Sequence, residues 1–122
     1  MKFWIDDLRE APEGYIWCKS VNDAIIKICQ VELDKLLIED GLRQGVYREP
    51  CGKVLATIQN IELIDIDHDA GDYASDGGDY IRLLDWLEET GRSYPIRIHS
   101  QNPVGVENMR RIIERNRWRE VR

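Results

Sequence analysis

Acidic side chains and histidines stand directly after three short apolar stretches of the sequence. They are Asp6, Asp7, Asp67, His68, Asp69 and His99. Two carboxylates about 4 Å apart repel each other by roughly 4 kcal/mol at an effective dielectric constant of about 20, so several at one place need a cation, a proton or an arginine. Carboxylate oxygens suit Mg²⁺ or another divalent cation, which commonly also takes phosphate oxygens of a substrate. We therefore predict a divalent-cation site whose ligands are Asp6, Asp7, Asp67 and Asp69.

The two histidines of the chain, His68 and His99, are the groups best able to exchange protons near neutral pH. Placed on either side of one phosphate, they could serve as base and acid in the cleavage of a phosphodiester. The alternative role is hydrogen bonding that holds neighbouring groups in place. Because side chains alternate between the two faces of a strand, the sequence leaves open whether both imidazoles point the same way.

The segment 99–105, His-Ser-Gln-Asn-Pro-Val-Gly, predicts a second kind of site, for an anion. Asn102 followed by Pro103 is typical of a helix start, with Asn as the N-cap. The free N–H groups and the dipole of a helix N-terminus favour anions. Gly105 would let a phosphate approach the backbone, and the Ser100 hydroxyl could bind a phosphate oxygen or act as a nucleophile. Arg9, in the first loop, is a candidate counter-charge to the carboxylates. The predicted substrate-binding residues are therefore Arg9, Ser100, Asn102 and Gly105.

Strands and helices must alternate along the chain to bring these residues together. Apolar patterns predict strands at residues 2–6, 15–18, 61–66 and 96–99, and two less regular strands at 54–58 and 118–121. They predict helices after Ser20, over residues 80–87 and after Asn102. Such alternation predicts a mostly parallel sheet, whose ligands bind outside the carboxyl ends of the strands. The first two strands are joined by only about eight residues, whereas a parallel crossover takes a dozen or more. They are therefore either antiparallel or joined by a taut loop.

The composition describes a single water-soluble domain, residues 1–122. The net charge is −6, with 43% hydrophobic and 33% charged residues. The longest apolar run covers only residues 15–18, too short for a membrane span of about 20 residues, so we expect a cytoplasmic protein without a membrane partner. The acidic balance also argues against broad binding of duplex nucleic acid.

Three stretches resemble the cyclic-phosphate-processing receiver-like domains, distant relatives of response-regulator receivers. They are residues 4–14 (WIDDLREAPEG), 67–69 (DHD) and 99–109 (HSQNPVGVENM). The resemblance covers most of the chain except about 31–60, which we interpret as an insertion. It implies a flavodoxin-like, three-layer α/β sandwich around a mostly parallel sheet. This sequence departs from the family pattern in one element, because we expect the helix between the first two strands to be missing.

The resemblance also implies roles for single residues. Asp6 and Asp7 match the metal-binding acid pair of receivers, Asp67 their phosphoacceptor and Ser100 their conserved hydroxyl, whereas the receiver lysine has no match. We predict a metal-assisted phosphoesterase acting on a cyclic phosphate, in a small ligand or at an RNA end, with Asp67, His68 and His99 as catalytic residues. The alternative is a receiver-like module that accepts a phosphoryl group or senses a phosphorylated ligand without catalysis.

Overall fold

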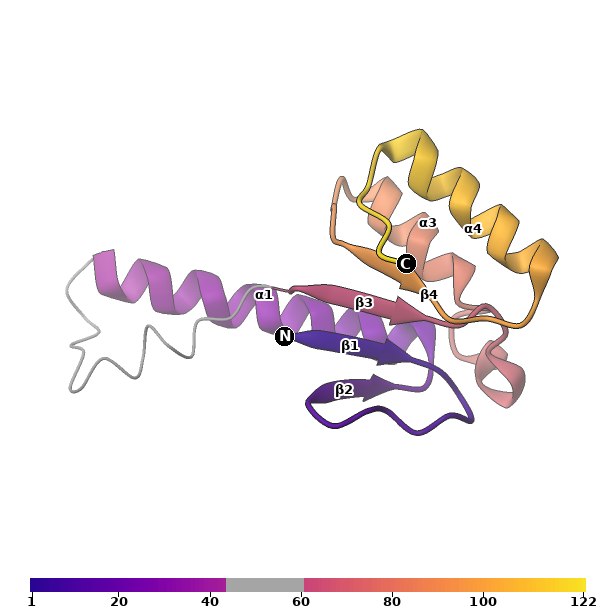
Figure 1. Ribbon diagram of the computed structural model, residues 1–122. Coiled ribbons are helices and arrows are strands. Elements are labelled where there is room, and N and C mark those ends of the chain that lie inside the picture. The colour runs from indigo at the N-terminus through magenta and orange to yellow at the C-terminus, as the bar shows by residue number, and fades with distance from the viewer. Residues whose placement is uncertain (44–60) are drawn as a thin grey trace.

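The computed structural model of the protein describes the backbone of residues 1–43 and 61–122 and the side chains of 1–37 and 61–122. Its centre is a sheet in which every neighbouring pair of strands is parallel, in the order β2-β1-β3-β4 (Figure 1). The strands are β1 (Lys2–Ile5), β2 (Tyr15–Cys18), β3 (Leu63–Ile66) and β4 (Ile96–Ile98). The strand expected at 54–58 lies outside the described residues.

The helices are α1 (Val21–Arg43), the short 3₁₀ helix η1 (Gly71–Ser75), α3 (Ile81–Glu89) and α4 (Pro103–Asn116). Two begin where the sequence predicts. The Ser20 hydroxyl accepts a hydrogen bond from the backbone N–H of Asp23 at 3.0 Å, and the Asn102 side chain accepts one from Gly105. Each cap satisfies a backbone donor that the first helical turn leaves without an internal partner.

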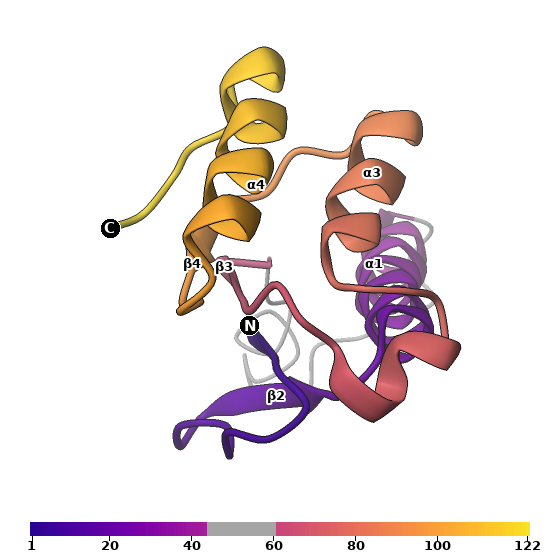
Figure 2. The same cartoon turned by 90° about the vertical axis from the view of Figure 1, so that its right-hand side faces the viewer.

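Helices α1, α3 and α4 all lie on the same side of the sheet (Figure 2). Phe3 and Ile5 of β1, together with Ile64 and Ile66 of β3, face them and are fully buried in one hydrophobic core. The chain moves in one direction across the sheet from β2 to β3 to β4, and right-handed crossovers therefore place the intervening helices on one side. The step from β1 to β2 runs the other way, so the helix missing there is the one that would cover the opposite face.

The predicted α/β receiver-like fold, with a parallel sheet and no helix between the first two strands, is confirmed. Of the three layers that the resemblance implied, the described residues form two. The missing first helix is the physical reason, since it would have built the third layer. The face away from the helices carries alternate residues of the strands instead, among them Trp4, Trp17 and Asp65.

Strand β2 is parallel to β1, which settles the orientation that the short connection left open. A four-residue strand is only about 13 Å long at about 3.3 Å per residue, so residues 6–14 can return in an extended path without a helix. The loop is held to the sheet by two tryptophans. The indole N–H of Trp4 donates to the carbonyl of Arg9, and that of Trp17 to the carbonyl of Asp6, each at 2.8 Å.

Two further expectations concern the ends of elements. The predicted closing strand at 118–121 is reduced to a single bridge between Ile96 and Glu120, while Trp118 packs into the core. Helix α1 runs on to Arg43, so the segment 31–60 starts inside a helix. Among the described residues, no helix combines the length and the apolar character that a membrane crossing requires.

Candidate functional site

The carboxyl ends of β1, β3 and β4 meet at a pocket of about 290 Å³. It is lined by Asp6, Asp7, Leu8, Arg9, Asp67, Asp69, Ser100, Gln101 and Asn102. We call it the acidic pocket. All four predicted cation ligands line it, together with three of the four predicted substrate-binding residues. Segments that are distant in the sequence thus lie together at one edge of the sheet.

Asp6 is the most deeply buried acid of the pocket, at 1% exposure. One carboxylate oxygen accepts hydrogen bonds from the backbone N–H groups of Leu8 and Arg9, each at 3.0 Å. The other lies 2.9 Å from Nε2 of His99. Burial by itself raises the pKa of Asp6, but these hydrogen bonds and the nearby imidazole outweigh it, and the pKa lies below its usual value. The folded protein therefore keeps Asp6 ionised and fixed in one orientation.

His99 joins Asp6 to a second buried carboxylate. Its Nδ1 lies 2.6 Å from Asp65, whose side chain is only 3% exposed. The imidazole also stacks on the indole of Trp4, with ring centroids 3.8 Å apart and planes within 5° of parallel. Because both ring nitrogens have carboxylate partners, we interpret His99 as a group that positions Asp6. Asp65 is not among the site residues predicted from the sequence, although an aspartate inside an otherwise apolar strand is a signal for a buried partner.

Asp7 shows how crowded the negative charge is. Burial raises the pKa of this carboxyl above its usual value, and the charges of Asp6 and Asp67 raise it further. A Cβ atom on Gly71 would lie 2.4 Å from a carboxylate oxygen of Asp7, and the φ of Gly71 is +55°. Only glycine allows the loop after β3 to pass so close in that conformation. Gly71 is not among the site residues predicted from the sequence.

The donor set of the acidic pocket fits a hard divalent cation. Asp6 and Asp67 offer carboxylate oxygens within 4.8 Å of each other, and Asp7 lines the same pocket. A ring nitrogen of His99 belongs to the same group of atoms, but it already contacts Asp6. No lysine or arginine among the described residues forms an ion pair with Asp6, Asp7 or Asp67, although Arg9 lines the same pocket. Several carboxylates without such a partner are the oxygen ligands that Mg²⁺ and similar ions take. Asp69 is more exposed and lies outside the tight group.

His68 points away from His99. Its ring packs against Gly105 of α4, where an added Cβ would lie 2.4 Å from Cγ of the imidazole, and its Nδ1 is 2.8 Å from Asp69. His99 stacks on Trp4, on the face of the sheet opposite the helices. The structure therefore does not place the two imidazoles on either side of one ligand, and neither lines the acidic pocket.

The start of α4 forms the polar wall of the pocket. The Ser100 hydroxyl accepts a hydrogen bond from the backbone N–H of Asn102 at 3.1 Å, and both side chains line the pocket beside the exposed Arg9. Gly105 does not line it. Its N–H donates to the Asn102 side chain at 3.0 Å, so the contact with His68, rather than a phosphate, accounts for a glycine at this position.

Comparison with known proteins adds one finding to this geometry. A family model described as "Cyclic-phosphate processing Receiver domain" matches residues 1–115, which is nearly the whole chain. No curated protein and no solved structure gave a match. The match includes every residue that lines the acidic pocket.

Proposed function

Because the chain belongs to the family of cyclic-phosphate processing receiver domains, we propose that it hydrolyses a cyclic phosphate ester in the acidic pocket. The observation that carries the proposal is the crowding of three carboxylates, Asp6, Asp7 and Asp67, beside the hydroxyl and amide groups of Ser100 and Asn102. Carboxylates alone would repel a phosphate, so a cation must join the two. The ligand class is a small cyclic nucleotide or the cyclic phosphate end of an RNA.

Asp6, Asp7 and Asp67 would hold Mg²⁺ or another divalent cation. Such an ion, when bound, neutralises phosphate charge and polarises the phosphorus–oxygen bonds. His99 acts through Asp6: it keeps one carboxylate oxygen engaged and the side chain in a fixed orientation. Preorganised charges of this kind need no rearrangement when the reaction begins.

The remaining side chains of the pocket would bind the phosphate and move protons. Ser100, Asn102 and Arg9 donate hydrogen bonds to phosphate oxygens. In hydrolysis, a water oxygen bonds to phosphorus, one ring phosphorus–oxygen bond breaks, and a proton passes from the water to the departing alkoxide. Asp69 lines the pocket and lies 2.8 Å from Nδ1 of His68, so this pair can take up the first proton and return one.

The test is an assay of 2′,3′-cyclic nucleotides with Mg²⁺ or Mn²⁺ and with EDTA. We expect metal-dependent opening of the ring by the wild type and a loss of at least about 100-fold in Asp67→Asn, since one charged ligand of the cation is gone. Asp72→Asn is the matched control, because Asp72 is an exposed acid of η1 outside the pocket. Equal turnover by Asp67→Asn and Asp72→Asn contradicts the proposal. Full activity of His99→Ala would mean that His99 has no role in the reaction.

A second candidate function rests on the position of Asp67. This carboxylate follows β3 and shares the pocket with the Asp6–Asp7 pair and Ser100, which is the arrangement of a phosphoacceptor site. Incubation with acetyl phosphate and Mg²⁺, followed by intact mass measurement, separates the two functions. A stable phosphoryl adduct that is lost in Asp67→Asn, without turnover of cyclic nucleotides, would favour the signalling role. Among the residues that the structure describes, no lysine lines the pocket, which makes this the weaker candidate.

A further inference from the structure

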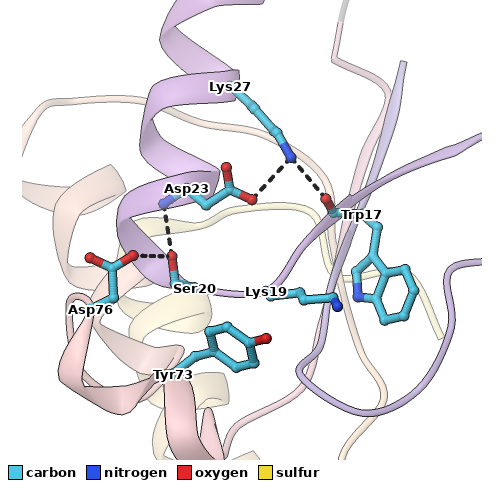
Figure 3. A pocket seen from close by; sticks show the side chains of 7 residues that line it. All are labelled: Trp17, Lys19, Ser20, Asp23, Lys27, Tyr73 and Asp76. Carbon is cyan, nitrogen blue, oxygen red and sulfur yellow. Dashed lines mark hydrogen bonds and ion pairs between the residues drawn. The ribbon is translucent and has the colours of Figure 1, made fainter.

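A second pocket of about 440 Å³ opens at the same edge of the sheet, where β2 ends and α1 begins. Figure 3 shows the side chains around it, which come from both ends of that connection and from the loop after β3. They are Trp17, Lys19, Ser20, Asp23, Lys27, Tyr73 and Asp76. We call it the aromatic pocket. None of these residues belongs to the site described above.

The aromatic pocket adjoins the acidic pocket. The indole N–H of Trp17 donates to the backbone carbonyl of Asp6 at 2.8 Å. On the other side, Tyr73 follows two residues after Gly71, the glycine on which an added Cβ would meet the carboxylate of Asp7. The Asp6–Asp7 segment, which lines the acidic pocket, therefore lies next to elements that line the aromatic pocket.

Each charged side chain of the aromatic pocket has a partner inside it or next to it. Lys27 lies 3.0 Å from Asp23 and also donates to the carbonyl of Trp17. Asp76 accepts hydrogen bonds from Ser20 at 2.6 Å and from Asn22 at 3.0 Å, and these bonds keep its pKa below the usual value. The pocket thus has two lysines and two aspartates, without a net charge that would select an isolated anion.

Its aromatic side chains offer a flat apolar surface. Tyr73 is a large residue that is 39% exposed, and Figure 3 shows its ring among the side chains that line the pocket. Lys19 already covers the indole of Trp17, with its Nζ 4.6 Å from the ring centroid. Tyr73 is therefore the ring open to stacking, and Lys19 is an exposed cation that lines the same pocket. A planar heteroaromatic group with hydrogen-bond donors would find both a stacking surface and carboxylate acceptors here.

We propose that the aromatic pocket binds the nucleobase of a nucleotide whose cyclic phosphate occupies the acidic pocket. This rests on the proposed function and specifies its substrate as a nucleoside derivative. The acidic pocket has a volume of about 290 Å³, and none of the described residues that line it is aromatic, so these residues offer no stacking surface for a base. The volume of its neighbour falls within the range of roughly 300–1,000 Å³ that is usual for small-molecule sites.

Two substrates that differ only beyond the phosphate ring test the base site. Cytidine 2′,3′-cyclic phosphate carries a base, whereas glycerol 1,2-cyclic phosphate does not. Stacking on one aromatic ring predicts a kcat/KM at least roughly tenfold higher for the nucleotide in the wild type. Tyr73→Ala should remove this preference and Tyr73→Phe should retain it, because only the ring is required.

Lys19 has a matched control in the same sheet. Lys2 also lies over an aromatic ring, with Nζ 5.6 Å from the centroid of Tyr15, but at the far end of β1. We expect Lys19→Ala to raise the KM for the nucleotide several-fold and Lys2→Ala to leave it unchanged. Equal effects of the two substitutions on both substrates would mean that Lys19 does not face the ligand.

Calorimetric titration tests the base site without turnover. The ligands are cytidine 3′-monophosphate and glycerol phosphate, each in the presence of Mg²⁺. The base-containing ligand should bind at least about tenfold more tightly to the wild type and equally to Tyr73→Ala. Equal binding of both ligands by the wild type, or an unchanged preference in Tyr73→Ala, refutes the base site whether or not hydrolysis occurs. Absence of turnover with a preserved binding preference instead refutes the proposed hydrolysis alone.

Discussion

Removal of His99 should cost the fold much of its stability, because the imidazole is the shared partner of two buried carboxylates. Asp6 and Asp65 are 1% and 2% exposed, and His99 lies 2.9 Å from the first and 2.6 Å from the second. His99→Ala leaves both without this partner in a place that water hardly reaches. The same substitution also removes the ring that stacks on Trp4.

The size of the effect follows from the burial of the two acids. Breaking a buried ion pair by removal of one partner costs about 3–5 kcal/mol, since an uncompensated charge stays behind. A domain of this size is stable by about 5–15 kcal/mol in total. We therefore expect His99→Ala to lose a large fraction of its free energy of unfolding. Arg97→Ala should lose only about 0–1 kcal/mol, because Arg97 contacts the same Asp65 at 4.0 Å from a half-exposed position.

Urea denaturation followed by tryptophan fluorescence measures these free energies. His99→Ala, Asp65→Ala and the double variant form a double-mutant cycle, with Arg97→Ala as the exposed control. If the imidazole and the carboxylate act as a unit, the double variant loses less than the sum of the single losses, by about 1–3 kcal/mol. Losses that add within about 0.5 kcal/mol would refute the interpretation of His99 as the positioning group between two acids.

Three further outcomes are expected. Gly105→Ala should destabilise the fold by about 1–3 kcal/mol in a thermal melt, because the new Cβ would lie 2.4 Å from the ring of His68; an unchanged melting temperature would mean that the two do not touch. Burial tends to raise the pKa of Glu32, but hydrogen bonds, mainly from Arg92, bring this pKa below the ordinary 4.5. The ionised carboxylate therefore stabilises the fold fully above pH 4.5, and this stabilisation is lost as the pH falls through the lower pKa of the folded state. The difference in the free energy of unfolding between the wild type and Glu32→Gln should therefore decrease in urea melts below about pH 4.5. A difference that does not change with pH argues against the ion pair of Glu32 with Arg92. Burial raises the pKa of the Cys18 thiol to about 12, so a variant with Cys18 as the sole cysteine should react with a maleimide at pH 7.5 only after unfolding, and rapid labelling of the folded form would contradict its burial.

Local features of the sequence were sufficient to predict most elements and the place of the pocket. Ser20 and the Asn102–Pro103 pair mark helix starts because an N-cap depends only on the next few residues. Acids directly after apolar strands predicted the acidic edge, since the carboxyl ends of parallel strands lie together. The strands themselves follow from short apolar runs bounded by glycine, proline and polar residues.

Contacts between distant segments decided everything else. The direction of β2 depended on whether residues 6–14 could span the sheet in an extended path, which composition alone does not reveal. The different surroundings of His68 and His99 follow from strand register and from the packing of α4, and a displacement of one residue would exchange the faces. The sequence by itself determined which groups gather at one edge of the sheet, and only the tertiary structure decided which of them share a ligand, because side-chain direction is set by neighbours far away in the chain.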